Sequence, residues 1–166
     1  GGTNDGYVCE IPPGTKLKPQ KHLYEEMVYI LEGHGATSVW QQNGKKQTFE
    51  WHPGSLFAIP LNAEYQHFNG QGNASVRFFA VTSAPFMMNL FHNLNFIFDN
   101  NFVFSDRFPP EEEDYFSSKG QAWGLKMSVN FVPNTTDMPL QVWNERGAGG
   151  RHVNFDLAGN VMGSHI

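Results

Sequence analysis

The chain has 166 residues and a formal net charge of −5, with 40% hydrophobic, 16% charged and 14% aromatic residues. This length and composition fit one folded domain, or one domain and the start of another, and exclude a disordered chain or a coiled coil. The acidic balance, with no basic run, argues against a nucleic-acid partner, and no apolar run is long enough to span a membrane. The single cysteine, Cys9, excludes a disulfide framework and a cysteine-based zinc site. Because the N-terminus lacks signal-peptide architecture, we expect a cytoplasmic protein.

Residues 7–83 carry the pattern of an antiparallel β-sandwich or barrel. Short apolar or alternating runs between Gly, Pro and Asn predict strands over Tyr7–Ile11, Met27–Leu31, Ala36–Gln41, Gln47–Trp51, Ser55–Ile59 and Val76–Thr82. Asn43-Gly44 predicts a hairpin between two of these strands, since both residues tolerate a positive φ. The regular spacing of the strands and the near absence of helical periodicity predict an all-β fold.

The composition changes after this segment. Pro85–Leu94 has an apolar surface that predicts a short helix, and residues 120–140 are predicted to be extended. Strand character returns near residue 153. The chain is therefore predicted to divide into a barrel at 1–83, a linker with a short helix at 84–150, and the opening strands of a second, truncated domain at 151–166.

The region 14–33 contains an ordered set of glycine, histidine and carboxylate positions: Gly14, Gln20, His22, Glu26 and Gly33. It resembles the first motif of the cupin superfamily, which is Gly, five residues, His-x-His, three or four residues, Glu, six residues, Gly. Every spacing fits this motif. The one departure is Gln20, which stands at the position of the first His.

The region 54–69 resembles the second cupin motif, which is Gly, five residues, Pro-x-Gly, two residues, His, three residues, Asn. Gly54, Pro60 and Asn69 occupy the corresponding positions. Asn62 replaces the second Gly, and Tyr65 replaces the His. The resemblance covers residues 1–83 closely. It is specific, because the two motifs match in order and in spacing.

The resemblance implies an all-β cupin jelly-roll barrel. The long C-terminal tail is similar in arrangement to that of gentisate-type ring-cleaving dioxygenases, which pair two cupin barrels and bind Fe(II) in one of them. It therefore implies a bicupin, of which this chain is the N-terminal barrel and the start of the second. The resemblance also implies a homo-oligomer, a dimer or larger.

The same residues have a physical interpretation that does not depend on the resemblance. In a regular strand, residues i and i+2 share a face, so Gln20 and His22 lie together, as do Tyr65 and His67. On the interior of a closed barrel, His22, Glu26 and His67 could form a two-His, one-carboxylate set for a divalent ion. Fe(II) is the expected ion, with Mn, Ni and Zn as alternatives. Gln20 and Tyr65 would then act at the catalytic site by orienting substrate or O₂.

Three functions remain open at this point. The first is a metal-dependent oxygenase or dioxygenase that acts on a small aromatic or carboxylic acid. The second is a degenerate, non-catalytic barrel without a cofactor, which serves ligand binding or dimerisation; the changes to Gln20 and Tyr65 favour it. The third is a metal-free isomerase or epimerase with His22 as base and Tyr65 as acid. The expected partners are a small-molecule substrate and further copies of the chain.

Overall fold

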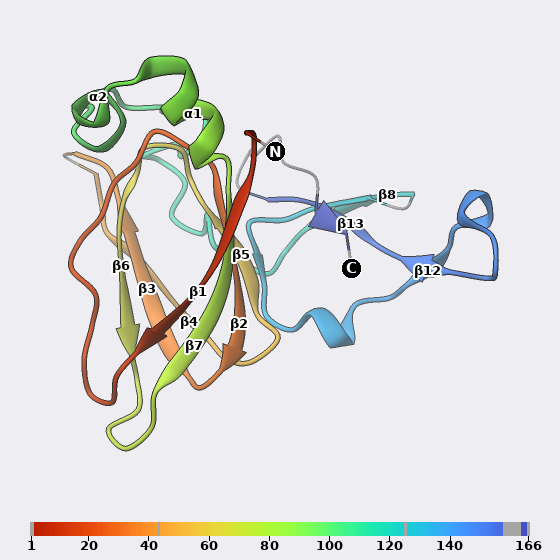
Figure 1. Ribbon diagram of the computed structural model, residues 1–166. Helices are drawn as coiled ribbons and strands as arrows, with labels where there is room; N and C mark the ends of the chain where they lie inside the picture. Colours follow the sequence, from red (N-terminus) through yellow and green to blue (C-terminus); the bar gives the residue numbers. More distant parts are fainter. Residues whose placement is uncertain (1, 43, 125, 158–163, 166) are drawn as a thin grey trace.

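The computed structural model of the chain describes residues 2–42, 44–124, 126–157 and 164–165, and it is built mainly of β-strands (Figure 1). The chain begins with the strands β1 (Asp5–Ile11), β2 (Glu26–Glu32), β3 (Gly35–Trp40), β4 (Gln47–Trp51), β5 (Leu56–Ile59), β6 (Glu64–Asn69) and β7 (Val76–Thr82). The helices α1 (Ala84–Phe91) and α2 (Leu94–Phe98) follow. Short elements complete it: β8 (Gln121–Trp123), β9 (Lys126–Ser128), β10 (Phe131–Val132), η1 (Thr135–Asp137), β11 (Gln141–Val142), η2 (Asn144–Arg146), β12 (Arg151–His152), β13 (Asn154–Asp156) and β14 (Ser164–His165).

Two sheets form the barrel. One has the strand order β1-β7-β2-β5-β10, and the other has the order β4-β3-β6. Their residues alternate between inside and outside: β7 buries Val76, Phe78 and Ala80 and exposes Arg77 and Phe79. Since this period of two belongs to strands with one face in a core, the structure confirms the predicted all-β jelly-roll barrel.

Two glycines of the predicted motifs lie in turns that need a positive φ. Gly33 has a φ of +85° and Gly54 a φ of +89°. A Cβ atom at Gly33 would lie only 2.4 Å from Cγ1 of Val76, and one at Gly54 would lie 2.6 Å from Oδ1 of Asn134. Glycine is therefore required at both positions by backbone conformation and by close packing.

The predicted hairpin is present in the pairing of the strands. β3 and β4 pair antiparallel, and the amide of Gly44 donates to the carbonyl of Gln41 at 2.9 Å. Asn43, the other residue of the predicted turn, lies outside the described residues.

The helical region differs from its prediction over Pro85–Leu94. Helix α1 begins one residue earlier and ends at Phe91, because His92 takes a left-handed conformation with a φ of 49°. The amide of His92 donates to the carbonyl of Met88, so this histidine terminates the helix. The second helix, α2, was not predicted; its N-cap Asn93 accepts a hydrogen bond from the amide of Phe96.

Residues 84–150, predicted as a linker, contribute to the barrel core. β10 pairs antiparallel with β5 and closes one edge of the larger sheet. Phe116 stacks on Phe49 with ring centroids 4.3 Å apart, and Phe108 belongs to the same buried cluster. The division of the chain into domains stays a prediction.

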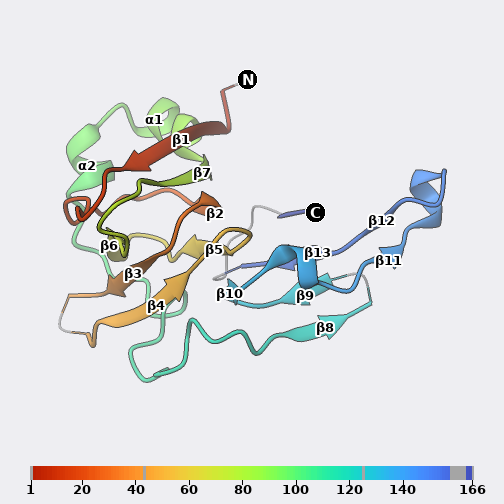
Figure 2. The same ribbon diagram turned by 90° about the horizontal axis from the view of Figure 1, so that it is seen from below.

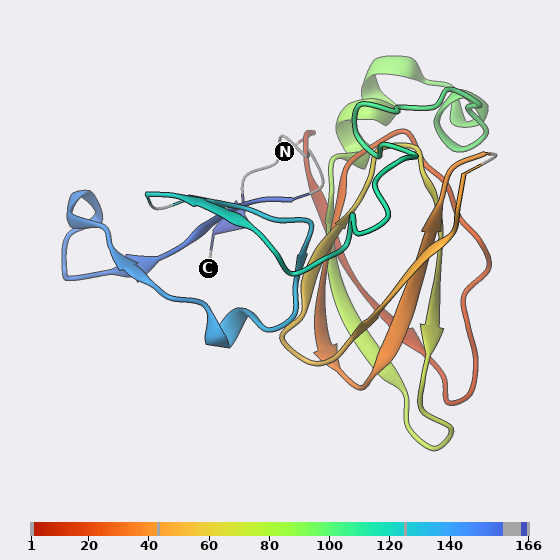
Figure 3. The same cartoon turned by 180° about the vertical axis from the view of Figure 1, so that it is seen from behind.

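A smaller sheet with the order β14-β13-β9-β8 lies beside the barrel, and the β11–β12 hairpin extends away from it (Figures 2 and 3). Part of the predicted opening of a second domain, residues 158–163 and 166, lies outside the described residues. Within the described part of the chain, no helix is long and apolar enough to cross a membrane. The cytoplasmic location stays a prediction.

Candidate functional site

The centre of the barrel holds a buried carboxylate, Glu26. It lies on β2 on the same inward face as Val28 and Ile30, as the strand period requires. Its Oε2 atom lies 2.9 Å from Nε2 of His22, and both side chains are buried. The motif spacing therefore placed His22 and Glu26 correctly as interior neighbours.

Glu26 has two further neighbours with hydroxyl groups. The hydroxyl of Tyr7 donates to Oε1 of Glu26 at 2.7 Å, and the hydroxyl of Tyr65 lies 3.5 Å from Oε2. The hydroxyl of Tyr65 also lies 3.1 Å from Nε2 of His22. We call Tyr7, His22, Glu26 and Tyr65 the Glu26 network. Both carboxylate oxygens are thus held by partners from other strands or loops.

The sequence prediction missed Tyr7. This residue lies on β1, which is separated from β2 by β7 in the sheet, so its approach to Glu26 depends on strand order. The sequence places Tyr7 in the predicted strand 7–11, which does not identify a partner.

The hydrogen bonds of His22 occupy both of its ring nitrogens. Its Nδ1 atom lies 2.9 Å from the carbonyl oxygen of Tyr24, and its Nε2 atom lies 2.9 Å from the Glu26 carboxylate. The ring also stacks on Tyr24 with centroids 3.8 Å apart, which fixes its orientation.

These contacts set the acidity of the network. Burial alone would raise the pKa of Glu26, but the hydrogen bond and charge of His22 and the hydrogen bond of Tyr7 outweigh it, and the net pKa is lowered. Burial and the negative charge of Glu26 raise the pKa of Tyr7 and of Tyr65. They also raise the pKa of Tyr24 to about 12. The network therefore combines a carboxylate with neutral phenols at neutral pH.

His67 lies on the same inward face of β6 as Tyr65, as predicted, but it has other partners. Its Nδ1 atom lies 2.7 Å from the hydroxyl of Thr37, which also accepts a hydrogen bond from Nε1 of Trp51. Its ring lies among those of Tyr65, Phe57 and Phe78.

The other ring nitrogen of His67, Nε2, is buried and has no hydrogen-bond partner. Burial lowers the pKa of this histidine to about 4, so it is neutral at pH 7. His67 is thus a neutral imidazole in an aromatic environment.

Gln20 approaches the network from its rim. It forms an isolated bridge with Tyr65, and its Oε1 atom lies 3.3 Å from the Tyr65 hydroxyl. Its side chain is otherwise exposed, so it contacts Tyr65 without joining the buried centre.

The predicted ligands do not converge in the way that a three-ligand metal site requires. Among the described residues, no group of three or more His, Cys, Asp or Glu side chains is arranged to hold a metal ion. Nε2 of His22 already faces Glu26, and a ligating imidazole must present a free lone pair. The assignment of His22, Glu26 and His67 as metal ligands stays a prediction.

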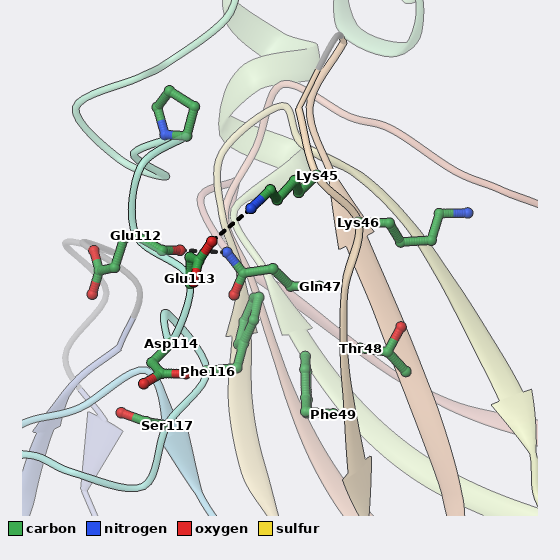
Figure 4. A pocket seen from close by; sticks show the side chains of 11 residues that line it. Lys45, Lys46, Gln47, Thr48, Phe49, Glu112, Glu113, Asp114, Phe116 and Ser117 are labelled. Carbon is green, nitrogen blue, oxygen red and sulfur yellow. Dashed lines mark hydrogen bonds and ion pairs between the residues drawn. The ribbon is translucent and has the colours of Figure 1, made fainter.

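A surface hollow of about 290 Å³ lies between β4 and residues 110–117 (Figure 4). Nζ of Lys45 pairs with Oε1 of Glu113 at 2.6 Å across it, and Gln47 donates to the carbonyl of Glu112 at 2.6 Å. These contacts attach the acidic loop to the barrel. None of the predicted site residues lines this hollow.

The fold and its interior define a small jelly-roll protein with a polar centre. Residues 7–82 match the Cupin domain family. The match agrees with the two motifs identified in the sequence. Asn62 replaces the second glycine of the second motif and has a φ of 58°, a conformation that both glycine and asparagine tolerate.

Solved structures that are similar to part of this chain include two vicilins and an oxalate decarboxylase. The vicilin of Solanum lycopersicum (tomato) is 15% identical, with a TM-score of 0.47, over 49% of this chain and 23% of its own. The vicilin of Capsicum annuum is 18% identical, with a TM-score of 0.47, over 49% of this chain and 22% of its own. The oxalate decarboxylase of Lactobacillus farciminis, solved as a formate complex, is 26% identical, with a TM-score of 0.46, over 50% of this chain and 25% of its own.

The aligned part spans about a quarter of the length of these solved proteins. A search among curated protein sequences found no match.

Proposed function

We propose that this barrel is a non-catalytic cupin domain, in which the former ligand positions stabilise the fold and the outer surface serves subunit assembly. The observation that carries the proposal is the buried pair of His22 Nε2 and Glu26 Oε2 at 2.9 Å. Tyr65, at the position of a motif histidine, contacts both members of this pair. The polar side chains of the Glu26 network hydrogen-bond to one another, as expected for a structural centre.

The surface near the helices supports a role in assembly. Helix α1 buries none of its residues against the rest of the chain, although it is mainly apolar. Large exposed side chains form what we call the apolar cap: Phe86, Met88, Leu90, Phe91, Leu94 and Phe96. Apolar groups gathered in this way on a surface are typical of an interaction site. Since α1 carries no charged residue, we propose a second copy of the chain as the partner.

We also propose that the barrel is one of two in a longer protein, with catalysis in the other barrel. The sheet β14-β13-β9-β8 supports this, because its strands pair with none of the strands of the two barrel sheets.

Sedimentation velocity tests the assembly. The protein is expected to sediment as a dimer or a larger oligomer, and Phe86→Ser with Leu90→Ser is expected to give monomers of unchanged circular dichroism. Leu140→Ser is the matched control, because Leu140 is exposed and lies outside the apolar cap, and it should leave the oligomer intact. A monomeric wild-type chain, or a double variant that stays associated, would contradict the proposal.

A second candidate is the metal-dependent oxygenase predicted from the sequence, with Fe(II), or Mn, Ni or Zn, held by His22, Glu26 and His67. The observation that favours it is the buried, unpartnered Nε2 of His67, a nitrogen of the type that binds these ions. Elemental analysis distinguishes the two candidates, since only this one requires a stoichiometric ion.

A further inference from the structure

A surface hollow of about 500 Å³ lies on the sheet β4-β3-β6, at the end where β3 begins and β4 ends. Its lining includes two histidines, His34 and His52, and one carboxylate, Glu50. None of these three residues belongs to the Glu26 network. The hollow is therefore a second place in the molecule where metal-ligating residue types gather.

The register of β3 and β4 brings the two histidines together. Gly35 pairs with Trp51 in this antiparallel ladder. His34 precedes Gly35 and His52 follows Trp51, so continuation of the register places the two histidines opposite each other. Residues directly opposite in an antiparallel pair have Cβ atoms about 4.5–5.5 Å apart, a spacing that allows two imidazoles to share one ion.

The three side chains belong to the outer side of the sheet. Along β4, Glu50 is exposed and Trp51 is buried, so Glu50 and His52 share the outward face. Ala36 pairs with Glu50, and it lines the same hollow as His34, two positions earlier in the chain. The hollow is therefore open to solvent and to ions in it.

A hydrogen bond sets the tautomer of His52. Its Nδ1 atom lies 2.9 Å from the carbonyl oxygen of Pro53. Because a carbonyl oxygen only accepts, Nδ1 carries the proton, and Nε2 of the neutral ring presents a lone pair. Metal-ligating histidines commonly donate their second N–H to a carbonyl group in this way, which fixes the ring and raises the basicity of the ligating nitrogen. His52 therefore has the tautomer that a metal ligand needs.

The main chain of His34 is fixed, whereas its side chain is exposed. Its amide donates to Oε1 of Gln71 at 2.9 Å, and its carbonyl accepts from the amide of Gly70 at 2.9 Å. These bonds hold the backbone of His34 at the start of β3. The exposed ring can still turn about its side-chain bonds, so it can reach an ion that His52 binds.

We propose that His34 and His52 bind a divalent transition-metal ion on the outside of the barrel, with water molecules completing its coordination. Imidazole suits Zn²⁺, Cu²⁺ and Ni²⁺, and two neutral ligands leave the charge of the ion to be balanced by Glu50 nearby. Because only two side chains hold the ion, it exchanges with the solution and is lost during purification. The site is independent of the proposed assembly role and of the barrel interior.

Titration of the ¹⁵N-labelled protein with Zn²⁺, followed in long-range ¹H–¹⁵N spectra of the imidazole rings, tests the proposal. Before zinc is added, His52 is expected to show a protonated Nδ1. On addition, the ring nitrogens of His34 and His52 should shift together with one midpoint. His34→Gln and His52→Gln should each weaken the binding at least roughly tenfold. His92→Gln removes an exposed histidine at the end of α1, and it should bind as the wild type does.

Three results would overturn the proposal. The first is the absence of a saturable shift at His34 and His52. The second is two separate midpoints for these histidines, or unchanged binding in either of the two variants, which would mean that they do not share an ion. The third is zinc binding that is lost in Glu26→Gln and kept in His52→Gln, which would place the ion at the centre of the barrel. None of these results bears on the assembly.

Discussion

Nε2 of His22 lies 2.9 Å from Oε2 of Glu26 at the centre of the barrel, where the two side chains are 3% and 1% exposed. A buried hydrogen bond is weak evidence for net stability, because the same groups bond to water in the unfolded chain. Removal of one partner is nevertheless destabilising, since it leaves the other polar atom buried without a partner. This asymmetry makes the pair testable by single substitutions.

Glu26→Gln should lower the free energy of unfolding by about 3 kcal/mol, because the carboxylate accepts hydrogen bonds from buried partners that a neutral amide satisfies less well. Urea unfolding followed by fluorescence measures this. Glu32→Gln is the matched control, since Glu32 ends the same strand but is exposed, and it should change the free energy by no more than about 0.5 kcal/mol. Equal effects of the two substitutions would show that the buried pair has no special role.

Tyr7→Phe should lower the free energy of unfolding by about 2 kcal/mol, because it removes a 2.7 Å hydrogen bond to a carboxylate. It should also raise the pKa of Glu26, since the Tyr7 hydroxyl is one of the groups that lower it. Tyr29→Phe on β2, outside the network, provides the comparison and should be close to wild type. The pKa of Glu26 can be followed by NMR through its side-chain carboxyl carbon. An unchanged pKa in Tyr7→Phe would contradict the assigned bond.

His67 should make the fold sensitive to mild acid. Its ordinary pKa of 6.5 is lowered to about 4 in the folded protein. Between these two pH values His67 is therefore protonated in the unfolded chain and neutral in the folded chain. Stability should therefore be complete above about pH 6.5 and fall as the pH decreases towards 4, by about 3 kcal/mol in total. Glu26, whose folded pKa is also lowered, adds a separate loss below its ordinary value of 4.5.

Urea unfolding at a series of pH values measures this loss. His67→Gln, which does not titrate, should remove the decline between pH 6.5 and 4. His34→Gln, at an exposed histidine, should retain it. A wild-type curve that is flat over this interval would show that His67 is solvated and charged.

Local spacing predicted the part of the site that depends on one motif. His22 and Glu26 lie in one short segment, so their approach could be inferred from the motif alone. Tyr7 could not be assigned, because its contact with Glu26 depends on the order β1-β7-β2. The contribution of β10 to the barrel likewise depends on pairing with β5, across more than seventy residues of sequence.

His67 was added to the predicted metal ligand set because it shares a strand face with Tyr65, and a shared face does not by itself identify the neighbours of a side chain. His67 does lie on the same face as Tyr65, but the next inward position along β6 is surrounded by Thr37, Phe57 and Phe78. The hydroxyl of Tyr65 contacts His22, and the ring of Tyr65 lies beside that of His67. The identity of neighbours across the barrel, and not the face alone, decides which donors meet.

Elemental analysis tests the central claim most directly. The protein should be purified without a histidine tag or chelator. The account predicts substoichiometric Fe, Mn, Ni and Zn in this chain, with stability unchanged after added Fe(II). About one ion per chain, lost in Glu26→Gln, would contradict it and would place a metal on His22, Glu26 and His67.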